Sequence, residues 1–289
     1  MEFDAAVIFL RKQIEAALVG HMDRLAVGAP PTLVAAMRYS LLGGGKRLRP
    51  LLTLAACEAA GAPATFALNA ACAIEMIHTY SLIHDDLPAM DDDDFRRGRP
   101  TLHKKFGEAL AILAGDALLT EAFGLLAAHS SAALAVAELS RAAGAAGMVG
   151  GQVLDIEATG HKVSLEELTA LHRGKTGALL AAAIRVGAKI GDANEADVAK
   201  FARFGEALGL AFQIIDDVLD VTADLATLGK DPGSDRAAGK TTFVDLLGVE
   251  GARAHAQTVM AEGLAALESF GPRANLLRSI AKFSIGRQS

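Results

Sequence analysis

The chain has 289 residues, of which 52% are hydrophobic and 21% are charged, with a mean hydropathy of +0.31. A net charge of −6 and a pI near 5.8 argue against nucleic acid as the main partner. No uncharged apolar stretch reaches the roughly 18 residues of a membrane-spanning helix, and Met1-Glu2-Phe3-Asp4 lacks the basic segment of a signal peptide. We therefore expect a cytoplasmic protein without a membrane span, in which Cys57 and Cys72 are reduced core residues.

Residue types along the chain predict an all-α fold in one domain, residues 1–289. Ala and Leu dominate many segments, while Val, Ile and Thr never form long alternating runs, and no repeat or linker interrupts the chain. Thr32 is expected to cap the second helix, and Ser164 with Glu167 has the pattern of a capping box. The expected helices cover residues 3–19, 32–42, 51–60, 66–87, 105–129, 132–147, 149–159, 165–188, 194–222, 241–268 and 272–284.

A glycine-rich segment with three cations follows the second expected helix. Gly43-Gly44-Gly45 lets the backbone approach a ligand closely, and Lys46, Arg47 and Arg49 come directly after it. Such a segment is equally typical of a flexible loop with solvated charges. As a functional element, it would be an anion site in which Lys46 and Arg49 contact the ligand.

Six carboxylates lie within ten residues in Asp85-Asp86-Leu87-Pro88-Ala89-Met90-Asp91-Asp92-Asp93-Asp94. Most isolated acidic runs are solvated turns, but a mostly apolar segment, residues 78–84, precedes this run, and Arg96 and Arg97 follow it. Arginines bind phosphate-like anions, so a cation site and an anion site would lie side by side. Pro88 disfavours helical geometry at Leu87, and a helix that ends there can return Asp91 to the side of Asp85.

A second acidic cluster, Asp216-Asp217-Val218-Leu219-Asp220, lies in an apolar segment about 130 residues later. Asp216 and Asp220 are one helical turn apart and share a helix face. Two such clusters in an apolar chain indicate one divalent-cation site built from two distant helices, and oxygen ligands favour Mg²⁺ or Mn²⁺. His78 shares a face with Asp85, so it is either a ligand-facing donor or an ordinary core residue.

Two later segments place cations in apolar surroundings or at a helix start. Lys175 and Thr176 lie within a long apolar helix, where a charge requires a partner. Gly239-Lys240-Thr241-Thr242 opens a further helix, which puts Lys240 near a positive N-terminus that favours phosphate. This segment is not a P-loop, because the upstream glycines and the preceding strand are missing.

In order along the chain, these segments resemble the motifs of trans-isoprenyl diphosphate synthases. The two acidic clusters match the two aspartate-rich motifs of that family, and the four residues between Asp86 and Asp91 resemble bacterial farnesyl and plant-type geranylgeranyl diphosphate synthases. The likeness extends from about residue 35 to the C-terminus. It rests on Gly44-Gly45-Lys46-Arg47-Leu48-Arg49-Pro50, His84-Asp85-Asp86-Leu87-Pro88-Ala89-Met90-Asp91 with Arg96-Arg97, Gly151-Gln152, Lys175-Thr176-Gly177, Phe212-Gln213-Ile214-Ile215-Asp216-Asp217-Val218-Leu219-Asp220, Gly229-Lys230 and Gly239-Lys240-Thr241-Thr242.

The resemblance implies an all-α bundle of about ten or more helices around a deep central cavity, assembled as a homodimer. It also implies a reaction in which isopentenyl diphosphate condenses with dimethylallyl or geranyl diphosphate by ionisation, condensation and elimination, with several Mg²⁺ ions bound. The text around Tyr80 is most similar to bacterial farnesyl diphosphate synthases, so we expect a C15 product. A C20 geranylgeranyl diphosphate synthase, a terpene cyclase and a non-catalytic partner subunit are also compatible with the resemblance, although retention of both acidic motifs argues against the last.

Mapped onto this sequence, the resemblance implies a role for each site residue. The metal ligands would be Asp85, Asp91, Asp216 and Asp220, with Asp86 and Asp217 as weaker candidates. Arg96, Lys175, Lys230 and Lys240 would bind the allylic diphosphate, and Gly45, Lys46, Arg49, His78 and Arg97 would bind isopentenyl diphosphate. Thr176 and Gln213 would stabilise the carbocation, so the catalytic set is Lys175, Thr176, Gln213, Asp85 and Asp216. Tyr80, with Ser81 and Ile77, would form the cavity floor that limits product length, although Tyr80 is equally suited to an ordinary core position.

Overall fold

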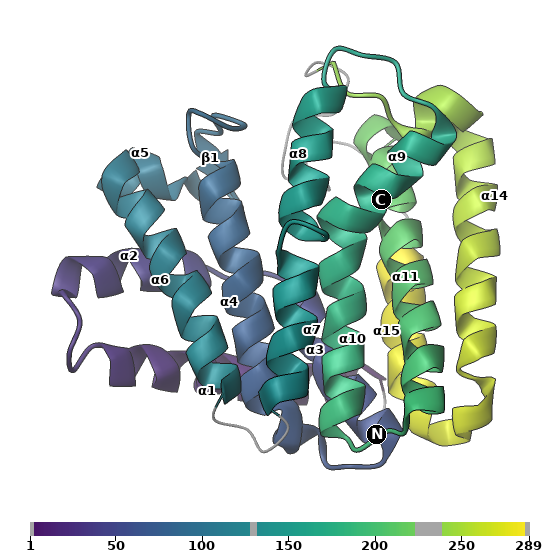
Figure 1. Ribbon diagram of the computed structural model, residues 1–289, viewed down its shortest axis with the longest axis horizontal. Helices are drawn as coiled ribbons and strands as arrows, with labels where there is room; N and C mark the ends of the chain where they lie inside the picture. Colours follow the sequence, from purple (N-terminus) through teal and green to yellow (C-terminus); the bar gives the residue numbers. More distant parts are fainter. Residues whose placement is uncertain (1–2, 128–131, 223–238, 287–289) are drawn as a thin grey trace.

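A computed structural model describes residues 3–127, 132–222 and 239–286, and it confirms the all-α prediction (Figure 1). Besides the α-helices it contains the 3₁₀ helices Ala64–Ala67 and Glu268–Ala274 and a π-helical turn, η2 (Arg173–Gly177). The α-helices are α1 (Phe3–Leu25), α2 (Pro31–Leu41), α3 (Leu48–Ala60), α4 (Leu68–Asp85), α5 (Leu102–Phe106), α6 (Glu108–Ala127), α7 (Ala132–Ala143), α8 (Met148–Ala158), α9 (Leu165–His172), α10 (Ala178–Ile190), α11 (Glu195–Thr222), α14 (Phe243–Ala266) and α15 (Asn275–Ile285).

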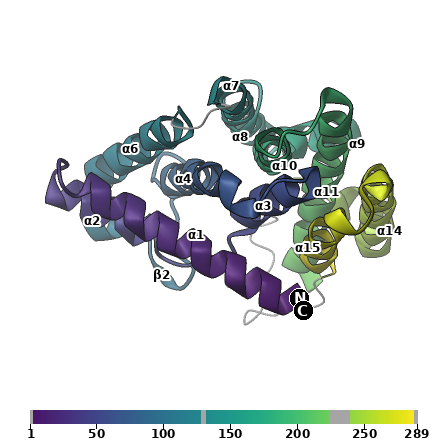
Figure 2. The same ribbon diagram turned by 90° about the horizontal axis from the view of Figure 1, so that it is seen from below.

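One hydrophobic core joins the helices, with members from Leu10 on α1 to Ala281 on α15. Figure 2 shows α3, α4 and α10 in the middle, with α1 along one side and α11, α14 and α15 at one end. Small residues allow close helix packing: a Cβ at Gly205 of α11 would lie 2.8 Å from the Cα of Ala181 on α10. The Ala-rich composition therefore serves a bundle in which backbones approach each other closely.

Most expected helices are confirmed, and the differences have local causes. The end of α4 at Asp85 agrees with the break predicted at Pro88. The capping box of Ser164 and Glu167 is present at the start of α9. Thr32, by contrast, is not an N-cap: α2 begins at Pro31, because proline suits the first helical turn, where its missing N–H leaves no bond unmade.

Two expected helices are divided, and one small sheet was not expected. The helix expected at 105–129 is divided, in its described part, between the end of α5 and α6, which Gly107 separates at φ +86°. The segment 165–188 consists of α9, η2 and α10. Between α4 and α5 lies an antiparallel hairpin of β1 (Phe95–Arg96) and β2 (Arg99–Pro100), in which Arg96 pairs with Arg99.

Two helical segments, Ala64–Asp85 and Glu108–Ala127, are long and apolar enough to cross a membrane by length and composition alone. Neither is uncharged, since the first contains Glu75 and the second contains Asp116. The most apolar window of the first segment is 67% buried, as in the core helix of a folded domain, and that of the second is 33% buried. Two helices of this length and composition are therefore only weak evidence for a membrane span.

Candidate active site

The first acidic cluster begins at the C-terminus of α4 and turns back on itself after Pro88. The backbone N–H of Asp91 donates to the carbonyl of Asp85 at 2.9 Å, so the turn brings the two residues together. Burial raises the pKa of the Asp85 carboxyl to about 6; Lys175 opposes this shift and Asp91 adds to it. An additional cation beside this carboxylate would therefore stabilise its ionised form.

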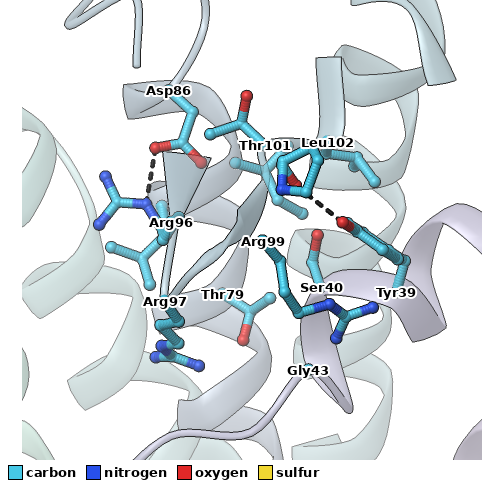
Figure 3. Close-up of a pocket in the computed structure, with 13 residues that line it drawn as sticks. Tyr39, Ser40, Gly43, Thr79, Asp86, Arg96, Arg97, Arg99, Thr101 and Leu102 are labelled. Atoms are coloured by element: carbon cyan, nitrogen blue, oxygen red, sulfur yellow. Dashed lines mark hydrogen bonds and ion pairs between the residues drawn. The ribbon is translucent and has the colours of Figure 1, made fainter. Parts of the chain in front are cut away.

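Asp86, the neighbour of Asp85, is 4% exposed and engages a different partner (Figure 3). Its carboxylate accepts a hydrogen bond from Nε of Arg96 at 2.6 Å, and Arg96 also reaches Asp93 at 3.3 Å. Burial raises the pKa of Asp86 to about 6, and Arg96 opposes the shift. Asp86 therefore connects α4 to the β1–β2 hairpin.

Lys175 has the partner that its apolar setting demands. Its Nζ lies 2.6 Å from the carboxylate of Asp155 on α8, and Nζ of Lys240 lies 3.1 Å from the same oxygen. Burial raises the pKa of Asp155, but the two lysines outweigh it and hold that pKa below its ordinary value. Lys240 also approaches Asp91, at 3.9 Å. Asp155, to which the sequence motifs assigned no role, thus gathers both lysines beside the first acidic cluster.

The turn that carries Lys175 and Thr176 is π-helical and packs against two glycines. A Cβ at Gly151 of α8 would lie 2.5 Å from the carbonyl carbon of Gly174, and a Cβ at Gly209 of α11 would lie 2.6 Å from Cα of Gly177. π-Helical turns inside α-helices are frequent at functional sites. The glycines allow this turn to lie between α8 and α11, within reach of both acidic clusters.

The second acidic cluster lies on α11 beside Thr176. The Thr176 hydroxyl donates to Oε1 of Gln213 at 3.0 Å, and Nε2 of Gln213 donates to Asp217 at 3.1 Å. The other oxygen of Asp217 accepts the backbone N–H of Phe243 at 2.9 Å. Asp217 is 3% exposed, so it connects α11 to the N-terminus of α14, just after Lys240.

The remaining predicted metal ligands lie on the same helix as Asp217. Asp216 is half-buried, and its negative charge opposes the lowering of the Arg49 pKa by burial. Asp220 is 2% exposed. Within the described residues, no group of three or more His, Cys, Asp or Glu side chains is close enough to hold a metal ion. Lys230 lies outside the described residues.

A second group of cations lies on the other side of the first acidic cluster, around the glycine-rich segment. Arg97 donates to the carbonyl of Gly44, and Arg11 of α1 donates to that of Gly45 at 2.8 Å. Burial lowers the pKa of Arg49 to about 10, and its buried Nε has no hydrogen-bond partner among the described residues. Burial, followed by Arg49 and Arg97, lowers the pKa of His78 well below its ordinary value. These residues, with the exposed Lys46, form a site of excess positive charge that suits an anion.

Arg47 differs from its neighbours Lys46 and Arg49, because it is 2% exposed and paired with two carboxylates. Its Nε lies 2.7 Å from Glu15 of α1, and its Nη1 lies 2.7 Å from Glu75 of α4. The residue has φ +52°, a left-handed conformation just before α3. Arg47 is therefore a structural cation that joins three helices, a role that the sequence did not reveal.

The residues expected to limit product length lie on α4. Tyr80 is 7% exposed, with its ring 5.7 Å edge-on from that of His84, and Ile77 is fully buried. The hydroxyl of Ser81 donates to the carbonyl of His78 at 2.9 Å. None of the three lines the pocket of Figure 3 or the pocket beside Asp155. Their role in product length stays a prediction.

Comparisons with known proteins identify the family that this chain matches. The model of the polyprenyl synthetase family matches residues 30–269. The farnesyl diphosphate synthase of Bacillus subtilis is 48% identical over 250 residues, which cover 84% of each chain. The chloroplastic geranylgeranyl pyrophosphate synthase of Capsicum annuum is 49% identical over 259 residues, which cover 87% of this chain and 70% of the relative. The apo crystal structure of an FPP/GFPP synthase from Zymomonas mobilis has a TM-score of 0.82 at 39% identity and covers 96% of this chain and 99% of that one.

Proposed function

This chain belongs to the polyprenyl synthetase family, and we propose that it joins isopentenyl diphosphate to an allylic diphosphate and forms farnesyl diphosphate. The supporting observation is that two cation groups flank the first acidic cluster. Lys175 and Lys240 meet at Asp155 on one side, and Arg49 and Arg97 lie at the glycine-rich segment on the other. Two separate anion sites suit a reaction between two diphosphates.

Mg²⁺ is the cofactor that the acidic residues fit. Their donors are all carboxylate oxygens, and burial raises the pKa of Asp85 despite the opposing charge of Lys175, so a further cation beside it would stabilise the ionised carboxylate. Mg²⁺ is usually held by one or two carboxylates together with substrate phosphates, so a complete protein cage is not required. Asp85, Asp91, Asp216 and Asp220 would hold several ions, either Mg²⁺ or Mn²⁺, which would supply positive charge for a departing diphosphate.

The chain's own residues account for the remaining requirements of the reaction. Lys175 and Lys240 bind the allylic diphosphate and stabilise its charge as the C–O bond breaks. The proton of the Thr176 hydroxyl is engaged by Gln213, so the oxygen presents lone pairs to an adjacent carbocation. Isopentenyl diphosphate is held by Lys46, Arg49, His78 and Arg97 while its alkene attacks. The released diphosphate takes the proton in this scheme, because the sequence motifs contain no obvious side-chain base.

Product length is the finer part of the proposal. Relatives that are nearly equally identical include farnesyl and geranylgeranyl synthases, so a C20 product is the second candidate. The buried Tyr80 supports the C15 product, because it is the bulky aromatic in the turn upstream of Asp85 and would limit a cavity that extends below the first acidic cluster. Chromatography of the product made from isopentenyl and dimethylallyl diphosphates with Mg²⁺ tests this. A Tyr80→Ala variant with an unchanged product distribution would remove Tyr80 as the floor.

The same incubation distinguishes a synthase from a terpene cyclase and from a non-catalytic partner subunit. Consumption of isopentenyl diphosphate supports the synthase. Cyclisation of an allylic diphosphate without consumption of isopentenyl diphosphate supports a cyclase, and a protein that converts neither substrate supports a partner subunit. Asp85→Ala and Asp216→Ala should each lower turnover by orders of magnitude, with near-normal circular dichroism. Glu166→Ala, at an exposed position of α9, is the control and should leave turnover unchanged. Wild-type rates in either aspartate variant would contradict the shared metal site.

A single catalytic domain that forms a cytoplasmic homodimer completes the proposal. The continuous core from α1 to α15 supports one domain. On α6, Ile112 is 43% exposed and Leu113 is 56% exposed, which suits an apolar contact with a second copy. Light scattering after size-exclusion chromatography tests the dimer, and a monomer at micromolar concentration would contradict it.

A further inference from the structure

The hairpin of β1 and β2 is too short to hold its own shape. Each strand has two residues, and isolated two-stranded hairpins are only marginally stable. Yet the hairpin and its turn carry Arg96, which the family resemblance assigns to the allylic diphosphate, and Arg97, which the proposed function assigns to isopentenyl diphosphate. Asp86 fixes Arg96 on one side, so a second support is needed on the side of β2.

Tyr39 on α2 supplies that support (Figure 3). Its hydroxyl donates to the carbonyl of Pro100 at 2.8 Å, and the guanidinium carbon of Arg99 lies 4.2 Å from its ring centroid. Both contacts are with β2. Nζ of Lys105 on α5 also lies 4.2 Å from the same centroid. The ring thus binds one cation from the hairpin and one from outside it, by the same cation–π interaction.

We propose that Tyr39, through Arg99 and Pro100, is a positioning residue for isopentenyl diphosphate. Arg99 pairs with Arg96 across the sheet, so holding β2 also fixes β1 and the turn between them. Arg97 lies in that turn at φ +54° and donates to the carbonyl of Gly44. A Cβ at residue 45 would lie 2.7 Å from Nη1 of Arg97, which shows how closely the guanidinium covers the glycine-rich segment.

This inference rests on the proposed function and predicts a selective kinetic effect. Loss of the hydroxyl in Tyr39→Phe removes one hydrogen bond to the hairpin, which corresponds to about a 2- to 10-fold rise in the KM for isopentenyl diphosphate. The kcat and the KM for the allylic diphosphate should change less than about 2-fold, because Asp86 holds Arg96 independently of Tyr39. Arg99→Met should raise the same KM, and Arg99→Lys should restore part of it, because lysine keeps the cation over the ring.

Lys105→Met is the matched control, because it removes the other cation from the same ring without touching the hairpin. If Tyr39 merely stabilises the fold, the Arg99 and Lys105 variants should lower the Tm alike and leave the KM values unchanged. If Tyr39 positions the hairpin, only the Tyr39 and Arg99 variants weaken the binding of isopentenyl diphosphate. In calorimetric titration, the Kd for isopentenyl diphosphate should likewise rise in the Tyr39 and Arg99 variants and stay unchanged in Lys105→Met.

The proposed function and the positioning role of Tyr39 fail in different ways. A wild-type protein that does not consume isopentenyl diphosphate overturns both together. An active wild type, with Tyr39→Phe and Arg99→Met retaining its KM and Kd for isopentenyl diphosphate, overturns only the positioning role. Equal KM increases in the Arg99 and Lys105 variants also overturn it, since that result would assign the effect to the ring's general packing.

Discussion

The Gly151→Ala substitution should separate catalysis from stability in this protein. Gly151 lies on α8 directly against the π-helical turn that carries Lys175 and Thr176. A methyl group there would overlap the backbone N of Lys175, and it would lie 2.5 Å from the carbonyl carbon of Gly174 and 2.6 Å from Cα of Lys175. All three are backbone atoms, so no flexible side chain can move aside, and the turn itself has to shift.

The size of the shift follows from these distances. Ordinary carbon contacts begin at roughly 3.5 Å, so the two carbon contacts require the turn to move by at least about 1 Å relative to α8, and the overlap with N of Lys175 requires a larger shift. A misplacement of about 1 Å in a catalytic group can cost about 100-fold in rate. Overpacking costs about 1–3 kcal/mol of stability, while alanine regains about 1 kcal/mol of helix propensity over glycine. We therefore expect a kcat about 100-fold lower with a modest loss in Tm.

The assay is steady-state consumption of isopentenyl diphosphate together with thermal unfolding. Gly124→Ala is the matched control: Gly124 is also helical, on α6, and a Cβ there meets nothing within 4 Å. That variant should keep wild-type kcat and be slightly more stable. Wild-type kcat in a folded Gly151→Ala variant would refute the reasoning, because Lys175 and Thr176 would then tolerate the displacement or not take part.

Three further predictions concern other contacts of the site. Asp217→Asn should raise the KM for the allylic diphosphate and lower the free energy of unfolding by about 1–3 kcal/mol. The reason is that the nitrogen of an amide cannot accept a hydrogen bond, so one of the two donors, Gln213 or the backbone N–H of Phe243, loses its partner. An unchanged KM would exclude a role of Asp217 in placing Lys240. Arg47→Met should cost about 3–5 kcal/mol in denaturant unfolding, since the carboxylate of Glu75 is left buried and unpaired, and addition of Glu75→Gln should recover part of the loss. Burial lowers the pKa of His172 from 6.5 to about 4 in the folded chain, so the unfolded chain binds more protons in that window and stability falls as pH drops through it. His172→Phe should therefore gain about 2 kcal/mol relative to wild type at pH 5 compared with pH 7.5; an equal difference at both pH values would contradict this assignment.

Local sequence rules predicted the parts of the site that depend on near neighbours. Pro88 restricts the residue before it, so the end of α4 could be placed within a few residues, and the return of Asp91 toward Asp85 followed. Lys175 in an apolar helix required a partner, because an unpaired buried charge is costly, and the structure supplies Asp155. The existence of these features was therefore accessible from the sequence, although the identity of the partner was not.

The parts that escaped prediction depend on packing between distant segments. Asp155 is one acidic residue on α8, and only the packing of η2 and residue 240 around it gives it two lysine partners. Lys46, Arg47 and Arg49 look alike in the sequence. Which of them is structural depends on the left-handed turn at Arg47, which directs that side chain toward α1 and α4. No period or propensity encodes that choice.

The paired aspartates have a mechanical consequence. Successive residues on a helix point in directions about 100° apart, so Asp85 and Asp86 face different neighbours from a single turn of α4, as Asp216 and Asp217 do on α11. In each pair the second carboxylate ties a covering segment to the helix, either the arginine hairpin or the start of α14. Each helical turn thus holds both a proposed metal ligand and, through the neighbouring carboxylate, the segment packed beside it. When the helix moves in thermal fluctuations, both move together, and their relative geometry is preserved.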